Sequence, residues 1–214
     1  KGISEQDVLC AAEALARAGI NHLKLYFMIG LPTETEEDLA ELLLLTDKVR
    51  KTLLGVGRET GRMGNITLSV NSFVPKAWTP FQFHGFAPLT VLKNSIKFLR
   101  KGVAGMANTR LVVDQPGNAF YQAVLARGDR KVGLALYAML EGGRNWRQTM
   151  QGCGVNPEDY AMRQRGQEER FPWEIIDHGI DRRYLWAEYR KALEEKSTLA
   201  CDTSQCRRCG VCHD

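Results

Sequence analysis

The spacing of hydrophobic residues changes period repeatedly along residues 1–114 and predicts alternating helices and strands. Helical spacing, with capping boxes at Ser4–Asp7 and Thr35–Asp38, predicts three helices. They cover residues 4–19, 35–54 and 88–102. Short runs rich in β-branched and aromatic residues predict strands over residues 22–29, 66–74 and 109–114. Because each strand follows a helix of crossover length, this order predicts an α/β fold with a parallel sheet.

The first two predicted strands each have an apolar face and a more polar face. Alternation places these residues on the apolar faces: Leu23, Leu25, Phe27, Ile29, Ile66, Leu68, Val70 and Val74. The opposite faces carry Lys24, Tyr26, Met28, Thr67, Ser69 and Asn71. Polar groups would be costly beneath a covering helix, so we expect these faces to line a shared cavity. This expectation favours the C-terminal portion of a partial (β/α) barrel over a flat doubly wound sheet.

Loops that follow strands are candidates for ligand contact, because α/β folds place binding loops at the carboxyl ends of parallel strands. In "GLPTET", Gly30 permits a tight turn and Glu34 is either a polar contact or a residue that favours the next helix start. The aromatic stretch "PKAWTPFQFHGF" either contacts substrate or packs on later helices; its candidates are Lys76, Trp78, Phe81 and His84. Residues 55–65 are Gly-rich and polar, which predicts a loop.

After residue 114, segments punctuated by Gly and Pro predict a series of helices. We therefore predict three parts: residues 1–115 as half of a barrel, residues 116–200 as a helical extension, and residues 201–214 as a Cys-rich tail. Arginine is concentrated late in the chain, which favours a solvated face of paired charges over a footprint for an anionic partner. In "RGDR", residues 127–130, we expect ion pairs within a pair of helices.

The composition is that of a soluble globular protein, with 44% hydrophobic and 25% charged residues and a net charge of +4 over 214 residues. No apolar run approaches the ~20 residues that a membrane-spanning helix needs. The cysteines form no regular disulfide framework, so we expect a reducing, cytoplasmic location. The sequence begins at Lys1 in what reads as a helix entry, which we interpret as a piece of a longer protein.

Four cysteines gather at the end of the chain in the spacing C-x4-C-x2-C-x2-C: Cys201, Cys206, Cys209 and Cys212. Two-residue gaps allow consecutive thiolates to converge on one metal centre. A tetrahedral zinc ion and a [4Fe–4S] cluster both suit four thiolates, and the C-x2-C-x2-C run favours the cluster. An unliganded tail is the alternative, although exposed free thiols would be prone to oxidation.

"KLYFMIGLPTETEEDL" followed by "SVNSFVPKAWTPFQ" resembles the second half of radical S-adenosylmethionine (SAM) enzymes. "LARGDRKVG", "FPWEIIDHGI" and "CRRCGVC" resemble more narrowly a group of uncharacterised radical SAM proteins, often with a cobalamin-binding region upstream. The resemblance implies reductive cleavage of SAM to drive radical chemistry on a small-molecule or macromolecular substrate, with cobalamin a further candidate cofactor of the whole protein. It also implies SAM contacts from Lys24, Tyr26, Met28, Gly30, Glu34, Ser69 and Asn71.

One departure from that family matters, because the C-x3-C-x2-C motif that holds its catalytic [4Fe–4S] cluster is absent from this sequence. The tail cysteines have a different spacing and lie at the wrong end of the fold to replace it. We therefore expect the chain to need an N-terminal half of the same protein as its partner, and to be inactive without it. Two alternatives remain open: a nucleic-acid-binding module with a zinc knuckle, and a small iron–sulfur electron-transfer protein.

Overall fold

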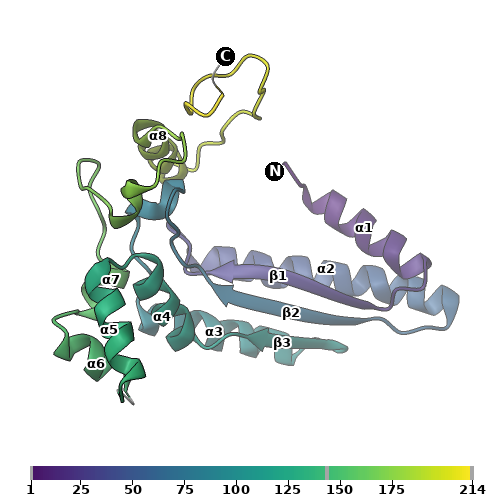
Figure 1. Ribbon diagram of the computed structural model, residues 1–214. Helices are drawn as coiled ribbons and strands as arrows, with labels where there is room; N and C mark the ends of the chain where they lie inside the picture. Colours follow the sequence, from purple (N-terminus) through teal and green to yellow (C-terminus); the bar gives the residue numbers. More distant parts are fainter. Residues whose placement is uncertain (1, 143–144, 213–214) are drawn as a thin grey trace. The chain divides into compact units, whose positions relative to one another are not determined.

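The computed structural model describes residues 2–142 and 145–212, which form two compact units (Figure 1). The first, here called the sheet unit, comprises Lys1–Ser72 and Leu89–Pro116. The second, the helical unit, comprises Phe73–Pro88 and Gly117–Asp214. The aromatic loop after the second strand thus belongs to the helical unit, although the strands on either side of it in sequence belong to the sheet unit.

The sheet unit alternates helices and strands in the predicted order. Its elements are α1 (Glu5–Arg17), β1 (His22–Ile29), α2 (Glu36–Thr60), β2 (Asn65–Ser72), α3 (Leu89–Ala104) and β3 (Thr109–Val113). The strands form a parallel sheet in the order β1-β2-β3. The predicted α/β fold with a parallel sheet is therefore confirmed. Both predicted capping boxes are present, at the starts of α1 and α2.

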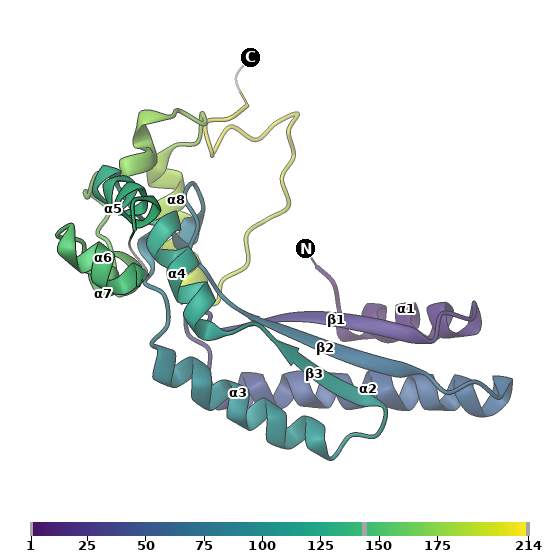
Figure 2. The ribbon, with the colours of Figure 1, turned by 60° about the horizontal axis from the view of Figure 1, so that its bottom comes forward.

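Helices cover the apolar face of this sheet, and Figures 1 and 2 show α2 and α3 running alongside the strands. One buried cluster joins side chains of α1, α2, β1 and β2. Its members are Ala12, Ala16, Leu23, Val49, Leu53, Val56 and Ile66. Leu68 and Val70 of β2 are also fully buried. The alternation read from the sequence thus identifies the face that the core occupies.

Two predicted boundaries in this unit are wrong. Strand β2 ends at Ser72, so Val74 is not part of its apolar face. Helix α2 continues to Thr60, through residues predicted as a loop. The glycines there fit the helix: a side chain at Gly57 would lie 2.6 Å from the carbonyl oxygen of Arg62. Gly61, with φ of 69°, ends the helix in the left-handed conformation that glycine adopts at low cost.

The helical unit consists of short helices joined by irregular segments. They are α4 (Pro116–Ala126), α5 (Arg130–Leu140), α6 (Trp146–Gly152), α7 (Pro157–Met162) and α8 (Arg182–Leu193), with 3-10 turns η1 (Pro80–Phe83) and η2 (Pro172–Ile175). An aromatic core joins Phe83, Phe171, Leu185 and Tyr189. Residues 197–212 contain no helix or strand. Within the described residues, every helix is too short or too polar to cross a bilayer.

Candidate functional site

The polar positions of the strands come into line across the open face of the sheet. The register pairs Lys24 with Thr67, Tyr26 with Ser69, and Met28 with Asn71. Strand β3 extends these rows, because Thr67 pairs with Arg110 and Ser69 with Val112. Side chains at paired positions of a parallel sheet point to the same side. We call this set the polar face; its members are Lys24, Tyr26, Met28, Thr67, Ser69, Asn71, Arg110 and Val112.

Contacts within the polar face link neighbouring side chains. The ammonium group of Lys24 lies 4.6 Å from the centre of the Tyr26 ring. Arg110 Nε donates a hydrogen bond of 2.9 Å to Thr67 Oγ1. When the side-chain amide of Asn71 is assigned with its nitrogen facing the neighbouring acceptors, that nitrogen donates a hydrogen bond of 3.0 Å to Asp114 Oδ2. Tyr26 is 67% exposed and Met28 54% exposed, whereas the hydroxyl-bearing Ser69 is buried.

The turn after β1 is held by the acidic residue predicted to contact a ligand. The backbone N–H of Gly30, with φ of 76°, donates to both carboxylate oxygens of Glu34, at 2.9 and 3.0 Å. Burial raises the pKa of this carboxyl, and hydrogen bonds from the amides of Gly30 and Leu31 oppose the rise. The described hydrogen bonds of Glu34 therefore organise the turn. A cavity of about 220 Å³ lies beside it, lined by Glu34 and Thr35 of the turn and by Ser95 and Phe98 of α3.

The opposite edge of the sheet also has a cavity, of about 420 Å³. Its polar lining comes from the amino ends of all three strands: His22, Asn65, Thr67, Thr109 and Arg110, together with Asn108. Thr67 and Arg110 belong both to this cavity and to the polar face. This edge was not predicted from the sequence, since loops at the amino ends of parallel strands are a less common place for ligands.

The tail cysteines lie in a turn-rich segment that is attached to the start of α8. The amide of Asp181 donates to the carbonyl of Cys209 at 2.8 Å. Cys206 Sγ accepts from Arg208 Nε at 3.4 Å, and this hydrogen bond lowers the pKa of the thiol. The four cysteines are free thiols, and the side chains of 2–142 and 145–212 include no group of three His, Cys, Asp or Glu placed to hold a metal. Thiol donors at this spacing suit iron–sulfur or zinc, and the site at Cys201, Cys206, Cys209 and Cys212 stays a prediction.

The aromatic loop packs into the core of the helical unit. The rings of Phe81 and Tyr189 meet edge to face at 6.3 Å between centroids. His84 Nδ1 lies 3.0 Å from the Tyr189 hydroxyl, and burial together with the charge of Arg127 lowers the pKa of this histidine. Of the two interpretations left open by the sequence, packing on the later helices is the one that these contacts support. Lys76 is exposed.

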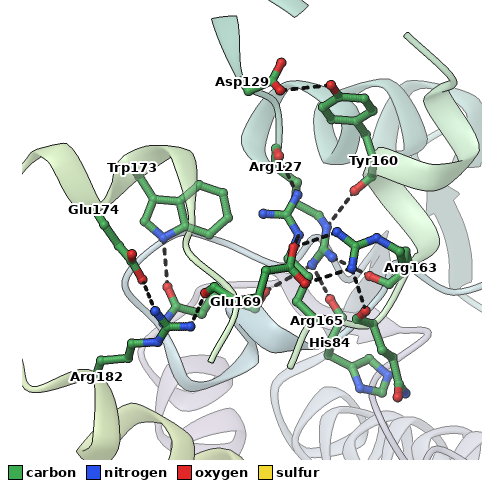
Figure 3. A network of polar contacts seen from close by, with 12 residues as sticks. His84, Arg127, Asp129, Tyr160, Arg163, Arg165, Glu169, Trp173, Glu174 and Arg182 are labelled. Carbon is green, nitrogen blue, oxygen red and sulfur yellow. Dashed lines mark hydrogen bonds and ion pairs between the residues drawn. The ribbon is translucent and has the colours of Figure 1, made fainter. Parts of the chain in front are cut away.

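The helical unit contains a cluster of arginines that was not predicted from the sequence (Figure 3). The predicted ion-pair role of Arg127 is wrong, since its buried guanidinium donates instead to the backbone carbonyls of four residues. These are Gln82, His84, Tyr160 and Arg163. Arg165 is buried as well, so a solvated face does not describe all the late arginines. A signal was present: Arg127 continues the buried stripe of α4 after Ala123 and Val124, at helical spacing.

Comparison with known proteins yields one significant relative among curated proteins. The chain is 33% identical over 132 residues to an uncharacterised protein of Methanocaldococcus jannaschii. The match covers 62% of this chain and 27% of that protein, so it spans about a quarter of the relative's length. No family model matches the chain. No solved structure matches it either.

Proposed function

We propose that the chain is the C-terminal part of a radical SAM enzyme and supplies part of the wall of its (β/α) barrel. The supporting observation is the polar face: side chains from three parallel strands in register, opposite the face that the helices cover. A barrel interior is lined by side chains of parallel strands, which suits this arrangement. In this proposal an N-terminal half of the same protein supplies the remaining strands and the catalytic iron–sulfur cluster.

The residues of the polar face would bind and orient SAM. The cluster and SAM supply the reductive cleavage when bound, and the protein supplies position and electrostatics. The ring of Tyr26 offers a stacking surface, and Lys24 offers a positive charge beside it. Ser69 and Asn71 offer a hydroxyl and an amide from the neighbouring strand. Met28 adds an apolar contact, while Glu34 holds the Gly30 turn at the end of β1.

The tail would form a second metal centre in this enzyme, with four thiolates as ligands. The hydrogen bond from Arg208 favours the thiolate of Cys206, which is the form that binds metal. A [4Fe–4S] cluster is our first choice and zinc the alternative. Such a centre would bind the tail firmly next to α8, where the Cys209 carbonyl already accepts a hydrogen bond from the Asp181 amide.

We further propose a cytoplasmic location, where thiols stay reduced, and cobalamin as a cofactor to test for in the whole protein.

Metal analysis tests this proposal. Iron, zinc and acid-labile sulfide would be measured after anaerobic purification, both in this chain and in the chain extended by the proposed N-terminal half. We expect the extended protein to carry one more cluster than the chain and to cleave SAM when reduced. Equal iron in both would contradict the proposed barrel.

A cysteine substitution separates the two centres. Cys209→Ala should remove only the tail metal, whereas Cys153→Ala, at an exposed cysteine outside the tail, should leave the metal content unchanged. Complete loss of SAM cleavage in Cys209→Ala, with the catalytic cluster still present, would show that the tail belongs to the catalytic centre and not to a separate one.

A further inference from the structure

A cavity of about 310 Å³ opens in the helical unit, and its lining is unusually rich in arginine. The charged residues around it are Arg127, Arg163, Arg165 and Arg170 against Asp129, Asp159 and Glu169, with Tyr160 and Pro172 completing the wall. Small-molecule sites commonly measure roughly 300–1,000 Å³, so this volume is at the lower end of that range. The whole lining belongs to one compact unit of the chain.

Two of the four cations of this cavity are more deeply buried than its anions. Arg127 and Arg165 are buried, whereas the side chain of Glu169 is 29% exposed and Asp159 is exposed. Burial, followed by the charges of Arg165 and Arg163, lowers the pKa of Arg127 to about 10. Buried guanidinium groups are normally compensated by a carboxylate of comparable burial, because an uncompensated charge is costly to desolvate.

The carboxylates of the cavity are engaged elsewhere or shared. Asp129 caps α5 by accepting from the amide of Lys131, and its other oxygen accepts from the Tyr160 hydroxyl at 3.0 Å. Asp159 accepts from the side-chain amide of Asn156. Glu169 accepts two hydrogen bonds from Arg163, at 2.6 and 2.8 Å. Glu169 is therefore the carboxylate that forms an ion pair with Arg165, and its Oε1 lies 3.8 Å from Arg165 Nε, beyond hydrogen-bonding distance.

One donor of Arg165 has no acceptor in the described structure. Its Nε is fully buried and makes no hydrogen bond, while its NH2 group donates to the carbonyl of Arg127. The side chain is fixed between that carbonyl and the rings of Phe171 and Trp173, at 5.4 and 5.1 Å from their centres. A rigid, buried guanidinium with an unused N–H at the wall of a cavity is a ready donor for an oxyanion.

We propose that this cavity binds the phosphate group of a small phosphorylated molecule, independently of any radical chemistry. Arg165 Nε and the guanidinium of Arg163 would donate to the phosphate oxygens. Arg170, exposed at the opening, would add to the positive potential. Glu169, which Figure 3 shows between Arg163 and Arg165, is the internal counter-ion that the phosphate replaces. The cavity volume leaves room for an organic part beyond the phosphate itself.

Calorimetric titration of the chain at constant ionic strength tests the proposal, with glycerol 3-phosphate, inorganic phosphate, glycerol and chloride as probes. We expect both phosphates to bind, the monoester more tightly, and glycerol and chloride not to bind. Absence of heat with both phosphates would overturn the proposal. Displacement of glycerol 3-phosphate by an RNA oligomer that binds more tightly would also overturn it, by assigning the arginines to a nucleic-acid backbone.

Glu169→Gln distinguishes a ligand site from a purely structural network. The variant frees Arg163 and Arg165 and removes a negative charge, so we expect phosphate binding roughly fivefold tighter, equivalent to about 1 kcal/mol. Arg163→Gln, at a half-exposed side chain, should weaken binding about tenfold. Arg183→Gln, at a side chain 85% exposed outside the cavity, is the matched control and should change nothing. Equal weakening by Arg163→Gln and Arg183→Gln, or weaker binding by Glu169→Gln, would contradict the assignment.

Discussion

The backbone amide of Gly30 donates to both carboxylate oxygens of Glu34, at 2.9 and 3.0 Å, and so closes the turn between β1 and α2. Glycine is suited to the first position, because its φ of 76° lies in the left-handed region. The carboxylate is half-buried in this turn. Glu34 thus positions the end of β1, which is where the polar face ends.

The ionisation of Glu34 should make the chain less stable as the pH rises. Burial raises the pKa of this carboxyl above its ordinary value of 4.5, so folding favours the protonated form. The stabilising contribution is fully present below the unfolded-state pKa and is lost as the pH rises from about 4.5 through the raised folded-state pKa. Glu34→Gln accepts from the same amide without ionising. Its free energy of unfolding, measured by urea titration, should fall less between pH 4 and 7 than that of the wild type.

A matched substitution in the first turn of α2 controls this experiment. Glu37 is exposed, and Glu37→Gln is the control for the loss of one negative charge near the turn. If the Glu34→Gln and Glu37→Gln profiles of the free energy of unfolding against pH coincide, the buried carboxylate does not determine the pH dependence of stability in this region.

The sheet was predictable because a parallel sheet and a two-residue alternation together determine which side chains share a face. Leu23 and Ile66 were assigned to the core from alternation alone, and they are buried in one cluster. The end of α2 was not predictable in this way. Gly57 reads as a loop residue, and the contact that its missing side chain permits, with the Arg62 carbonyl, is visible only in three dimensions.

The candidate sites likewise divide into those that follow from a local sequence pattern and those that depend on contacts distant in sequence. The strand pattern predicts that Tyr26 and Ser69 face the same side of the sheet, and the register pairs them. The acceptors of Arg127 do not follow from any local pattern, since they lie 33 to 45 residues away in sequence. The proposed metal centre of the tail is inferred from ligand spacing alone, since the described side chains bring no three such ligands together.

The two faces of β1 should respond very differently to truncation. Leu23 lies in the core, and Leu23→Ala should cost about 2–5 kcal/mol in the free energy of unfolding. The double variant Lys24→Ala with Tyr26→Ala removes an exposed pair and should cost less than about 1 kcal/mol. Urea denaturation measures both. Similar losses in the two variants would mean that the polar face of the chain is covered, not open.

Gly85 should tolerate no side chain. A β-carbon at this position would lie 2.0 Å from the carbonyl oxygen of Met162 and 2.7 Å from its carbon. The neighbouring amides hold the two segments together, because Phe86 donates to Ala161 at 2.8 Å and Arg165 to Phe83 at 2.8 Å. Gly85→Ala must separate them, so we expect a loss of at least about 1–3 kcal/mol in thermal or urea unfolding.

A glycine in a helix of the same unit provides the control for Gly85→Ala. Gly133 lies within α5 with open space around it, and Gly133→Ala should stabilise the chain by up to about 1 kcal/mol. An equal loss from the two alanine substitutions would indicate that the helical unit tolerates neither, for reasons other than the contact with Met162.

Arg127 should be the most costly arginine of the helical unit to replace. Its buried guanidinium donates to the backbone carbonyls of Gln82, His84, Tyr160 and Arg163. These hydrogen bonds join the end of α4 to two other segments, residues 82–84 and 160–163, and so hold three segments together. Arg127→Met keeps much of the apolar stem but leaves these acceptors without their donor. Each acceptor that water cannot reach should lower the free energy of unfolding by about 1–3 kcal/mol. We expect a total loss of at least about 3 kcal/mol in urea unfolding and only partial recovery in Arg127→Lys, because an ammonium cannot reproduce the planar fork.

Arg130→Met, at an exposed position on α5, is the control and should change the free energy of unfolding by less than about 0.5 kcal/mol. Full recovery in Arg127→Lys would show that a single positive charge is sufficient there, and that the directed hydrogen bonds do not hold the three segments.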